Sequence, residues 1–125
     1  MSLQAIRSDR LSPPVGPFSQ AVRAGDFLFL SGQVGVDSAG TLVAGGVEAQ
    51  AEQIFANLGA VLDAAGKSFA DVVRAGVFLT DMADFAALNA VYAKHFDQPY
   101  PARTTIAVAA LPGGAAVEID LVVKA

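Results

Sequence analysis

The sequence contains no cysteine, a single histidine, and few charged residues, which make up 16% of its 125 residues. Without cysteine the chain can form no disulfide and no thiolate, so cysteine catalysis and sulfur-ligated zinc or iron–sulfur sites are excluded. One histidine supplies too few ligands for an ordinary metal site, so we expect no metal. The longest apolar runs are interrupted by Gly, Asp or Arg well before the roughly 20 residues that a membrane-spanning helix needs.

Positive charge is scarce as well, with 8 Lys and Arg against 12 Asp and Glu and a net charge of −4. Binding to nucleic acid through its phosphates needs clustered cations, so nucleic acid is a poor candidate partner. Near the start, Arg7, Asp9 and Arg10 interrupt the apolar core that a secretory signal requires. We therefore expect a cytoplasmic protein.

The hydrophobic fraction of 54% is too high for a disordered chain and sufficient for a core. The length predicts one domain, residues 1–125, without internal repeats. Three prolines and a glycine at 10–17 predict an irregular loop. The turn signal at Ala24-Gly25-Asp26 predicts a hairpin, whose second strand ends near Ser31-Gly32-Gln33, where glycine favours a bulge or a close backbone approach.

Apolar residues at helical spacing predict a helix that follows a turn at 37–41 and stops at Gly66. A buried strand should follow at 71–80. Asp84 is the predicted N-cap of a shorter helix that buries one apolar stripe, formed by Phe85, Leu88, Tyr92 and Phe96. The runs at 103–111 and 116–125 are joined by a turn at Pro112-Gly113-Gly114, which predicts a second hairpin.

This order predicts an α+β fold with a mixed sheet of six strands and two helices on one face. In the last strand Val117, Ile119 and Leu121 alternate with Glu118 and Asp120, and Val122 shares the second face. Two helices cannot cover both faces of such a sheet. Another copy of the same chain is the simplest cover, so we expect a symmetric oligomer.

Two features are better explained by structure than by chemistry. The string AAGKS at 64–68 imitates a phosphate-binding loop, but Val61 stands where its first glycine should be and the string follows a helix. We interpret it as a glycine helix end with an exposed lysine. His95 lies near the end of the short helix without a partner motif, so we interpret it as a structural residue.

Arg103 starts a strand that is otherwise free of charge, and it follows Pro101-Ala102. It could be an ordinary solvated arginine or a rigid bidentate clamp for a carboxylate. Glu118 could be its salt-bridge partner or a general base, and the predicted hairpin leaves open whether the two share a face. Asn89 could cap a loop or line a site. Ser31-Gly32-Gln33 offers a hydroxyl and backbone N–H groups, a modest cue for anion binding.

Four segments together resemble the RidA (YjgF) family of reactive-imine deaminases: VGPFSQAV at 15–22, FLSGQVGVD at 29–37, TDMADFAALNAVYAKHF at 80–96, and YPARTTIAVAALPGGAAVEIDLVV at 100–123. The last is the most specific, because its PAR[ST] start and E-I-[DE] end match in residue and spacing. The resemblance implies a chorismate-mutase-like fold (bacillus type), assembled as a homotrimer with sites between subunits.

The resemblance also implies roles for individual residues. Arg103 would bind the carboxylate of a 2-imino acid, Glu118 would position or activate water, and Ser31, Gly32 and Asn89 would line the pocket. Two positions depart from the usual pattern. Phe18 replaces a tyrosine and so removes a hydroxyl donor, and Thr105 stands where cysteine is common.

The implied reaction hydrolyses 2-iminobutanoate- or 2-iminopropanoate-type imines and enamines to 2-keto acids and ammonia, without cofactor or metal. Three alternatives stay open at this point. The first is a deaminase of another enamine or imine, such as aminoacrylate or an aminomuconate. The second is a non-catalytic regulator that binds a small ligand. The third is an endoribonuclease or translation inhibitor, an activity ascribed to some relatives, which the acidic balance disfavours.

Overall fold

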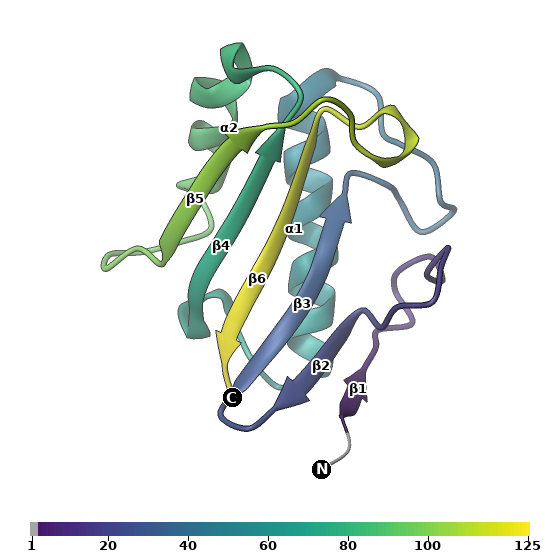
Figure 1. The fold of residues 1–125 in the computed structure, drawn as a ribbon, viewed down its shortest axis with the longest axis vertical. Coiled ribbons are helices and arrows are strands. Elements are labelled where there is room, and N and C mark those ends of the chain that lie inside the picture. Colours follow the sequence, from purple (N-terminus) through teal and green to yellow (C-terminus); the bar gives the residue numbers. More distant parts are fainter. Residues whose placement is uncertain (1–2) are drawn as a thin grey trace.

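The computed structural model describes residues 3–125 and shows one six-stranded sheet with two α-helices (Figure 1). The strand order across the sheet is β1-β2-β3-β6-β4-β5. Among the strand pairs within residues 3–125, β4–β5 alone is parallel, so the sheet is mixed, as predicted. The elements are β1 (Gln4–Ile6), β2 (Ala21–Ala24), β3 (Phe27–Val34), α1 (Gly46–Ala64), β4 (Val72–Leu79), α2 (Phe85–Tyr92), β5 (Ala102–Ala107) and β6 (Val117–Lys124).

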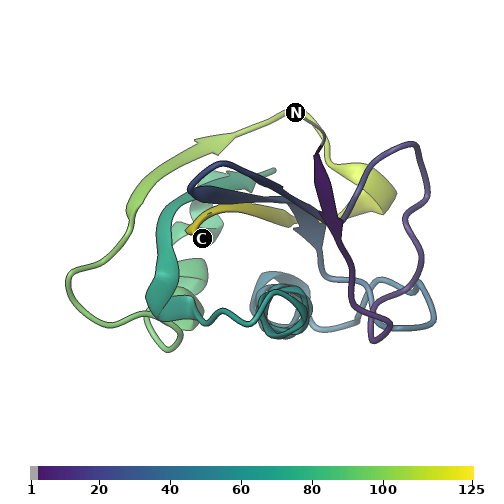
Figure 2. The same cartoon turned by 90° about the horizontal axis from the view of Figure 1, so that it is seen from below.

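Both helices pack on the same face of the sheet, which confirms the predicted layering (Figure 2). The helix α1 buries an apolar face that includes Ile54, Phe55 and Leu58, as its helical spacing predicted. The helix ends at Ala64, and Gly66 follows with a φ of 71°, a conformation that glycine adopts without strain. The AAGKS string is thus a helix end. The β2–β3 hairpin also forms as predicted, with Gly25-Asp26 as its turn.

The short helix α2 differs from the prediction in two respects. Asp84 occupies the N-cap position, but its side chain makes no capping hydrogen bond. The carboxylate of Asp81 instead accepts from the backbone N–H of Ala83 in the preceding 3₁₀ turn. Leu88 and Tyr92 are buried as expected, whereas Phe85 is 38% exposed. The prediction that Phe85 joins the core is wrong, because at the start of α2 the ring lies over the guanidinium of Arg103 at the edge of the sheet.

The predicted hairpin between the last two strands is also wrong. β5 pairs in parallel with β4, and β6 inserts between β3 and β4, so β5 and β6 are not neighbours. Burial explains the difference. The core-facing residues of β6 are 0–2% exposed, which a central strand achieves, whereas β5 keeps the partly exposed pattern of an edge strand. Pro112–Gly114 forms a 3₁₀ turn in a longer connection.

The face of the sheet opposite the helices remains open. Phe29 on β3 and Ile106 on β5 are each 45% exposed, and both line a depression of about 540 Å³ that crosses β3, β6, β4 and β5 on this face. No helix within residues 3–125 is long and apolar enough to cross a membrane. This open face is the surface that we expected a second copy of the chain to cover.

The central position of β6 can be tested with two chemically identical substitutions. Val117 on β6 is fully buried and Val73 on β4 is 39% exposed. We expect Val117→Ala to lower the free energy of unfolding by about 2–3 kcal/mol and Val73→Ala to lower it by less than about 1 kcal/mol. Urea unfolding of both variants measures the difference. Equal losses would contradict the central placement of β6.

Candidate functional site

Arg103 lies on the edge strand β5 and packs against α2. Its Cζ is 4.6 Å from the ring centroid of Tyr92 and 5.5 Å from that of Phe85. Its Nη2 donates a hydrogen bond to the Oδ1 of Asn89 at 2.7 Å. A surface cavity of about 320 Å³ opens beside the guanidinium, lined by Asn89, Tyr92, Ala93, Tyr100, Pro101 and Arg103. This group is called the arginine half-site below.

Glu118 lies on the open face, in β6, and is half-buried. Burial raises the pKa of its carboxyl above the usual value, and the neighbouring Asp120 carboxylate raises it further. The strand β3 shifts register between Leu30 and Gln33, a bulge that brings Gly32 against Glu118. A Cβ on residue 32 would collide with the Oε2 of Glu118, so glycine is required here for the carboxylate to keep its place. The predicted close backbone approach at Gly32 is confirmed.

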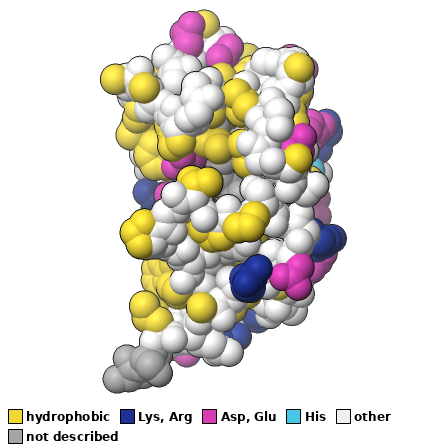
Figure 3. Space-filling model, turned by 90° about the vertical axis from the view of Figure 1, so that its right-hand side faces the viewer, with side chains coloured by type: hydrophobic (Ala, Val, Ile, Leu, Met, Phe, Trp, Pro, Cys, Tyr) yellow, Lys and Arg dark blue, Asp and Glu magenta, His cyan; other side chains and the backbone are white. Residues whose placement is uncertain are grey.

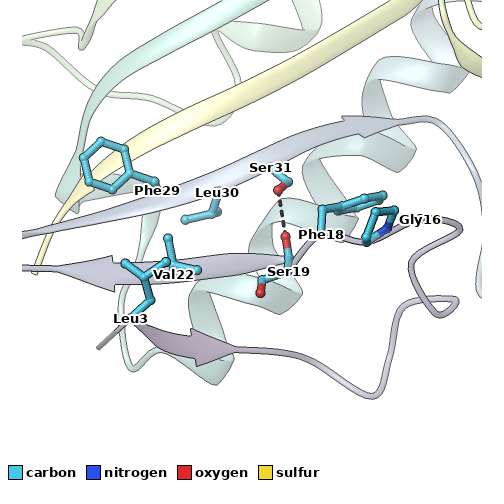
Figure 4. A pocket seen from close by; sticks show the side chains of 9 residues that line it. Leu3, Gly16, Phe18, Ser19, Val22, Phe29, Leu30 and Ser31 are labelled. Carbon is cyan, nitrogen blue, oxygen red and sulfur yellow. Dashed lines mark hydrogen bonds between the residues drawn. The ribbon is translucent and has the colours of Figure 1, made fainter. Parts of the chain in front are cut away.

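Phe18 precedes β2 and lines a cavity together with Glu118, and Ser31 lies within β3, next to Gly32. Phe18 is 50% exposed and lines two adjoining cavities. One, of about 640 Å³, runs over Phe29, Leu30 and Ser31 (Figure 4). The other, of about 380 Å³, is lined mainly by apolar side chains and contains Gly32 and Glu118. Hydrophobic side chains gather on this side of the molecule (Figure 3). Glu118, Gly32, Phe18 and Ser31 are called the glutamate half-site below.

Ser31 does not offer the free donors that the sequence suggested. Its hydroxyl donates to the carbonyl of Ser19 at 2.7 Å (Figure 4), and its backbone N–H donates to the carbonyl of Gln20 at 2.9 Å. Both donors are therefore used inside the chain. What Ser31 contributes is the anchoring of β3 to the segment that carries Phe18, together with an oxygen that can still accept a hydrogen bond.

The two half-sites lie on opposite faces of the sheet. Arg103 is paired with Ala75 of β4, which is fully buried on the helix side, whereas Glu118 is paired with Phe78, which lines the open face together with Asp120. Thr105 shares the helix side with Arg103, and its Oγ1 is buried with no hydrogen-bond partner among residues 3–125. The hairpin that could have placed Arg103 and Glu118 together does not exist, so one chain does not bring them into a common site.

His95 takes part in neither half-site. Its ring stacks on Phe55 with centroids 4.2 Å apart, and its Nε2 lies 3.3 Å from the Oε1 of Glu52. Within residues 3–125 no group of three or more His, Asp or Glu side chains is placed to hold a metal ion. The structural interpretation of His95 fits these contacts.

Sequence reasoning missed the contacts of Phe85 and Tyr92 with Arg103 and the influence of Asp120 on Glu118. The spacing of residues 85, 89 and 92 places all three on one face of a helix and could have indicated a shared contact. An apolar stripe that packs on the core has the same helical spacing, however, and only the structure shows that this face contacts Arg103. Asp120 could have been found from its i+2 spacing to Glu118 on one strand face.

Comparison with known proteins identifies relatives along nearly the whole chain. The family model described as endoribonuclease L-PSP matches residues 9–125. Protein DfrA of Myxococcus xanthus is 50% identical over 125 residues, which cover 98% of this chain and 95% of that protein. The 2-iminobutanoate/2-iminopropanoate deaminase of Capra hircus is 48% identical over 118 residues, 94% of this chain and 86% of that protein.

Solved structures share the fold as well. RidA from an Antarctic Psychrobacter species superposes with a TM-score of 0.93 at 46% identity, covering 98% of this chain and 99% of that one. TdcF of E. coli, solved with bound serine, gives a TM-score of 0.90 at 36% identity and covers 98% of each chain. The complete domain is therefore shared with these proteins.

The raised pKa of Glu118 predicts a pH-dependent gain in stability for Glu118→Gln. A carboxyl whose pKa is higher in the folded chain than its ordinary 4.5 favours folding when protonated, and this contribution is lost as the pH rises through the folded value. The variant and the parent should therefore be equally stable at pH values below the ordinary pKa of 4.5, where the carboxyl is protonated in both the folded and the unfolded chain. At neutral pH the variant should be the more stable of the two.

Thermal unfolding of both proteins, from acid to neutral pH, measures the difference in their stability. Glu48→Gln is the control, because this carboxylate is exposed in the first turn of α1, where negative charge is favourable. We expect Glu48→Gln to be no more stable than the parent at neutral pH. A Glu118→Gln variant that is no more stable than the parent at neutral pH would contradict the prediction.

Proposed function

Because the chain belongs to the endoribonuclease L-PSP (RidA/YjgF) family, we propose that it hydrolyses reactive 2-imino acids and their enamine tautomers to 2-keto acids and ammonia. The substrates would be of the 2-iminobutanoate and 2-iminopropanoate type, which the name of the Capra hircus relative contains. The observation that carries the proposal is the pair of half-sites. One presents a guanidinium that forms no ion pair within residues 3–125, and the other a carboxyl of raised pKa beside apolar cavities.

Each half-site supplies one requirement of the reaction. The guanidinium of Arg103 can hold the substrate carboxylate with two parallel hydrogen bonds. The C=N carbon of a 2-imino acid is already electrophilic, so the remaining needs are an aligned water and proton transfer. With the imine nitrogen protonated, Glu118 takes a proton from the water as its oxygen bonds to this carbon, which gives a neutral tetrahedral carbinolamine. Glu118 returns this proton to the amine nitrogen, the C–N bond breaks and ammonia leaves, and the hydroxyl proton of the carbinolamine passes to the Glu118 carboxylate as the C=O bond of the keto acid forms.

The raised pKa of Glu118 suits this double use. A carboxyl of ordinary pKa releases its proton readily but returns it poorly near neutral pH. A value closer to the working pH allows the same group to act first as a base and then as an acid, an effect that contributes about 10²- to 10⁴-fold in rate. Phe18 supplies a ring at the wall of the site without the hydroxyl of a tyrosine.

We further propose that the active assembly is a homotrimer of the chorismate-mutase-like type, with each site formed by two subunits. Arg103 and Glu118 face opposite sides of the sheet in one chain, so a site that contains both needs Arg103 from one copy and Glu118 from the next. The open face, with Phe29 and Ile106 exposed, is the surface that a second copy would cover. A symmetric arrangement of this kind forms three equivalent sites.

The endoribonuclease activity in the family description is not the function we propose. The net charge of −4 and the apolar cavities around Glu118 favour a small substrate over an RNA backbone. Deamination of another enamine or imine, such as aminoacrylate or an aminomuconate, would use the same residues. A panel of imines distinguishes these substrates.

A coupled assay tests the proposed chemistry. Imines are generated in situ from several amino acids by an amino-acid oxidase, and their decay is followed with and without the protein. We expect Arg103→Lys to lower kcat/KM by at least about tenfold, because lysine keeps the charge but loses the planar two-point grip. The exposed Arg7→Lys is the control. The mechanism would be refuted if the parent protein accelerates the decay of no imine, or if Arg103→Lys is as active as the parent.

Mixing two inactive variants tests whether subunits share the site. Arg103→Lys and Glu118→Gln chains are unfolded together, refolded at equal concentrations and assayed. If each site takes Arg103 and Glu118 from different copies, random mixing restores about a quarter of the sites. If both residues act within one chain, mixing restores none. Sedimentation equilibrium of the parent should give three times the 12.7 kDa chain mass, and a monomer at micromolar concentration would refute the assembly.

A further inference from the structure

Three residues on one face of α2 contact a single guanidinium. Phe85, Asn89 and Tyr92 follow one another at helical spacing, and each contacts Arg103: the two rings through their faces and the amide through a 2.7 Å hydrogen bond. This geometry restricts the plane of the guanidinium. A guanidinium carries five N–H groups, and the bond from Nη2 to Asn89 uses one of them. Within residues 3–125 one complete pair of parallel N–H groups therefore has no hydrogen-bond partner, and Arg103 lines the neighbouring cavity.

The partners of Arg103 are all neutral. Arg7 and Arg10 pair with Asp9 and Asp63, but Arg103 has no carboxylate within ion-pair distance among residues 3–125. A carboxylate partner would position the guanidinium equally well but would also neutralise it. Aromatic rings and an amide fix its orientation and leave its positive charge available to an anion.

The two rings differ in burial, and both keep their faces against the guanidinium. Phe85 is 38% exposed, so its ring contributes little to the core and lies against the guanidinium instead. Tyr92 is 6% exposed, yet its hydroxyl has no hydrogen-bond partner among the described residues. Burial raises the pKa of this hydroxyl, so it stays neutral beside the cation. The feature of Tyr92 that the site uses is the ring face.

We propose that Phe85 and Tyr92 are positioning residues, which hold the guanidinium plane of Arg103 so that its free N–H pair meets the substrate carboxylate. This inference rests on the proposed function of Arg103 as carboxylate anchor. The rings act only through Arg103 and touch no reacting atom. Their loss should therefore weaken anion binding and leave the chemistry at Glu118 unchanged.

The primary experiment measures binding of 2-oxobutanoate, a keto acid that does not react, by titration calorimetry. Tyr92→Leu should weaken binding about tenfold, which corresponds to about 1.4 kcal/mol, within the range of a desolvated cation–π contact. Phe85→Leu should weaken it about threefold, because this ring is more distant and more exposed. Tyr92→Phe keeps the ring and should bind as the parent does.

Phe69→Leu is the matched control. Like Tyr92, this ring packs against Phe55 and Phe96, but it makes no cation–π contact with Arg103. It should lower stability without changing the affinity for the keto acid. If Tyr92→Leu does not fold, the exposed Phe85→Leu still tests the proposal.

Kinetics and a double-mutant cycle separate positioning from structural support. With an imine substrate, Tyr92→Leu should raise KM about tenfold and leave kcat within about threefold, because carboxylate binding is lost equally from ground state and transition state. In the Arg103→Lys background the same substitution should change KM by less than about twofold. An equal effect in both backgrounds would mean that the ring acts without Arg103, and would overturn the proposal.

The outcomes also separate this proposal from the proposed function. Normal keto-acid affinity and normal KM in both Tyr92→Leu and Phe85→Leu would overturn the positioning role and leave imine hydrolysis standing. A parent protein that binds 2-oxobutanoate through Arg103, loses affinity on ring removal and hydrolyses no imine would support the positioning role and refute the proposed function.

Discussion

The structure depends on the burial of one side of β6 at the centre of the sheet. Val117, Ile119, Leu121 and Val123 are 0–2% exposed and face the helices. Because side chains alternate along a strand, this burial places Glu118 and Asp120 on the face without helices. A slip of one residue would carry both carboxyl groups into the core. The position of the glutamate half-site is therefore a consequence of how the core packs.

The arginine half-site has a different origin. The parallel pairing of β4 with β5 needs a connection that crosses over the sheet, and α2 is part of that connection. Residues of the connection consequently pack on the strand that it leads to, which brings Phe85, Asn89 and Tyr92 onto Arg103. The neighbour of Arg103 on β4 is Ala75, whose small side chain leaves room beneath the guanidinium. Each half-site thus follows from topology, and topology also separates them.

Local signals in the sequence predicted the elements well and their arrangement only in part. The α1 stripe, the Gly25-Asp26 turn and the bulge at Gly32 each depend on near neighbours, and all were predictable. The pairing of β6 with β3 and β4 depends on which strands bury their apolar faces most fully, and a Pro-Gly-Gly turn cannot indicate that. Arg103 and Glu118 could be proposed from residue type and family resemblance. Their separation on two faces, and the contacts of Phe85 and Tyr92, needed the fold.

The neutral surroundings of Arg103 affect how an anion reaches the protein. The chain as a whole carries a net charge of −4 and repels a carboxylate at long range, while the uncompensated guanidinium attracts it only nearby. Salt at physiological concentration screens fields beyond about 8 Å. Dissolved ions therefore weaken the long-range repulsion more than they weaken the short-range attraction between the Arg103 guanidinium and a carboxylate. Capture of small anions by this protein should tolerate the ionic strength of a cell better than that of an enzyme which relies on long-range electrostatic steering.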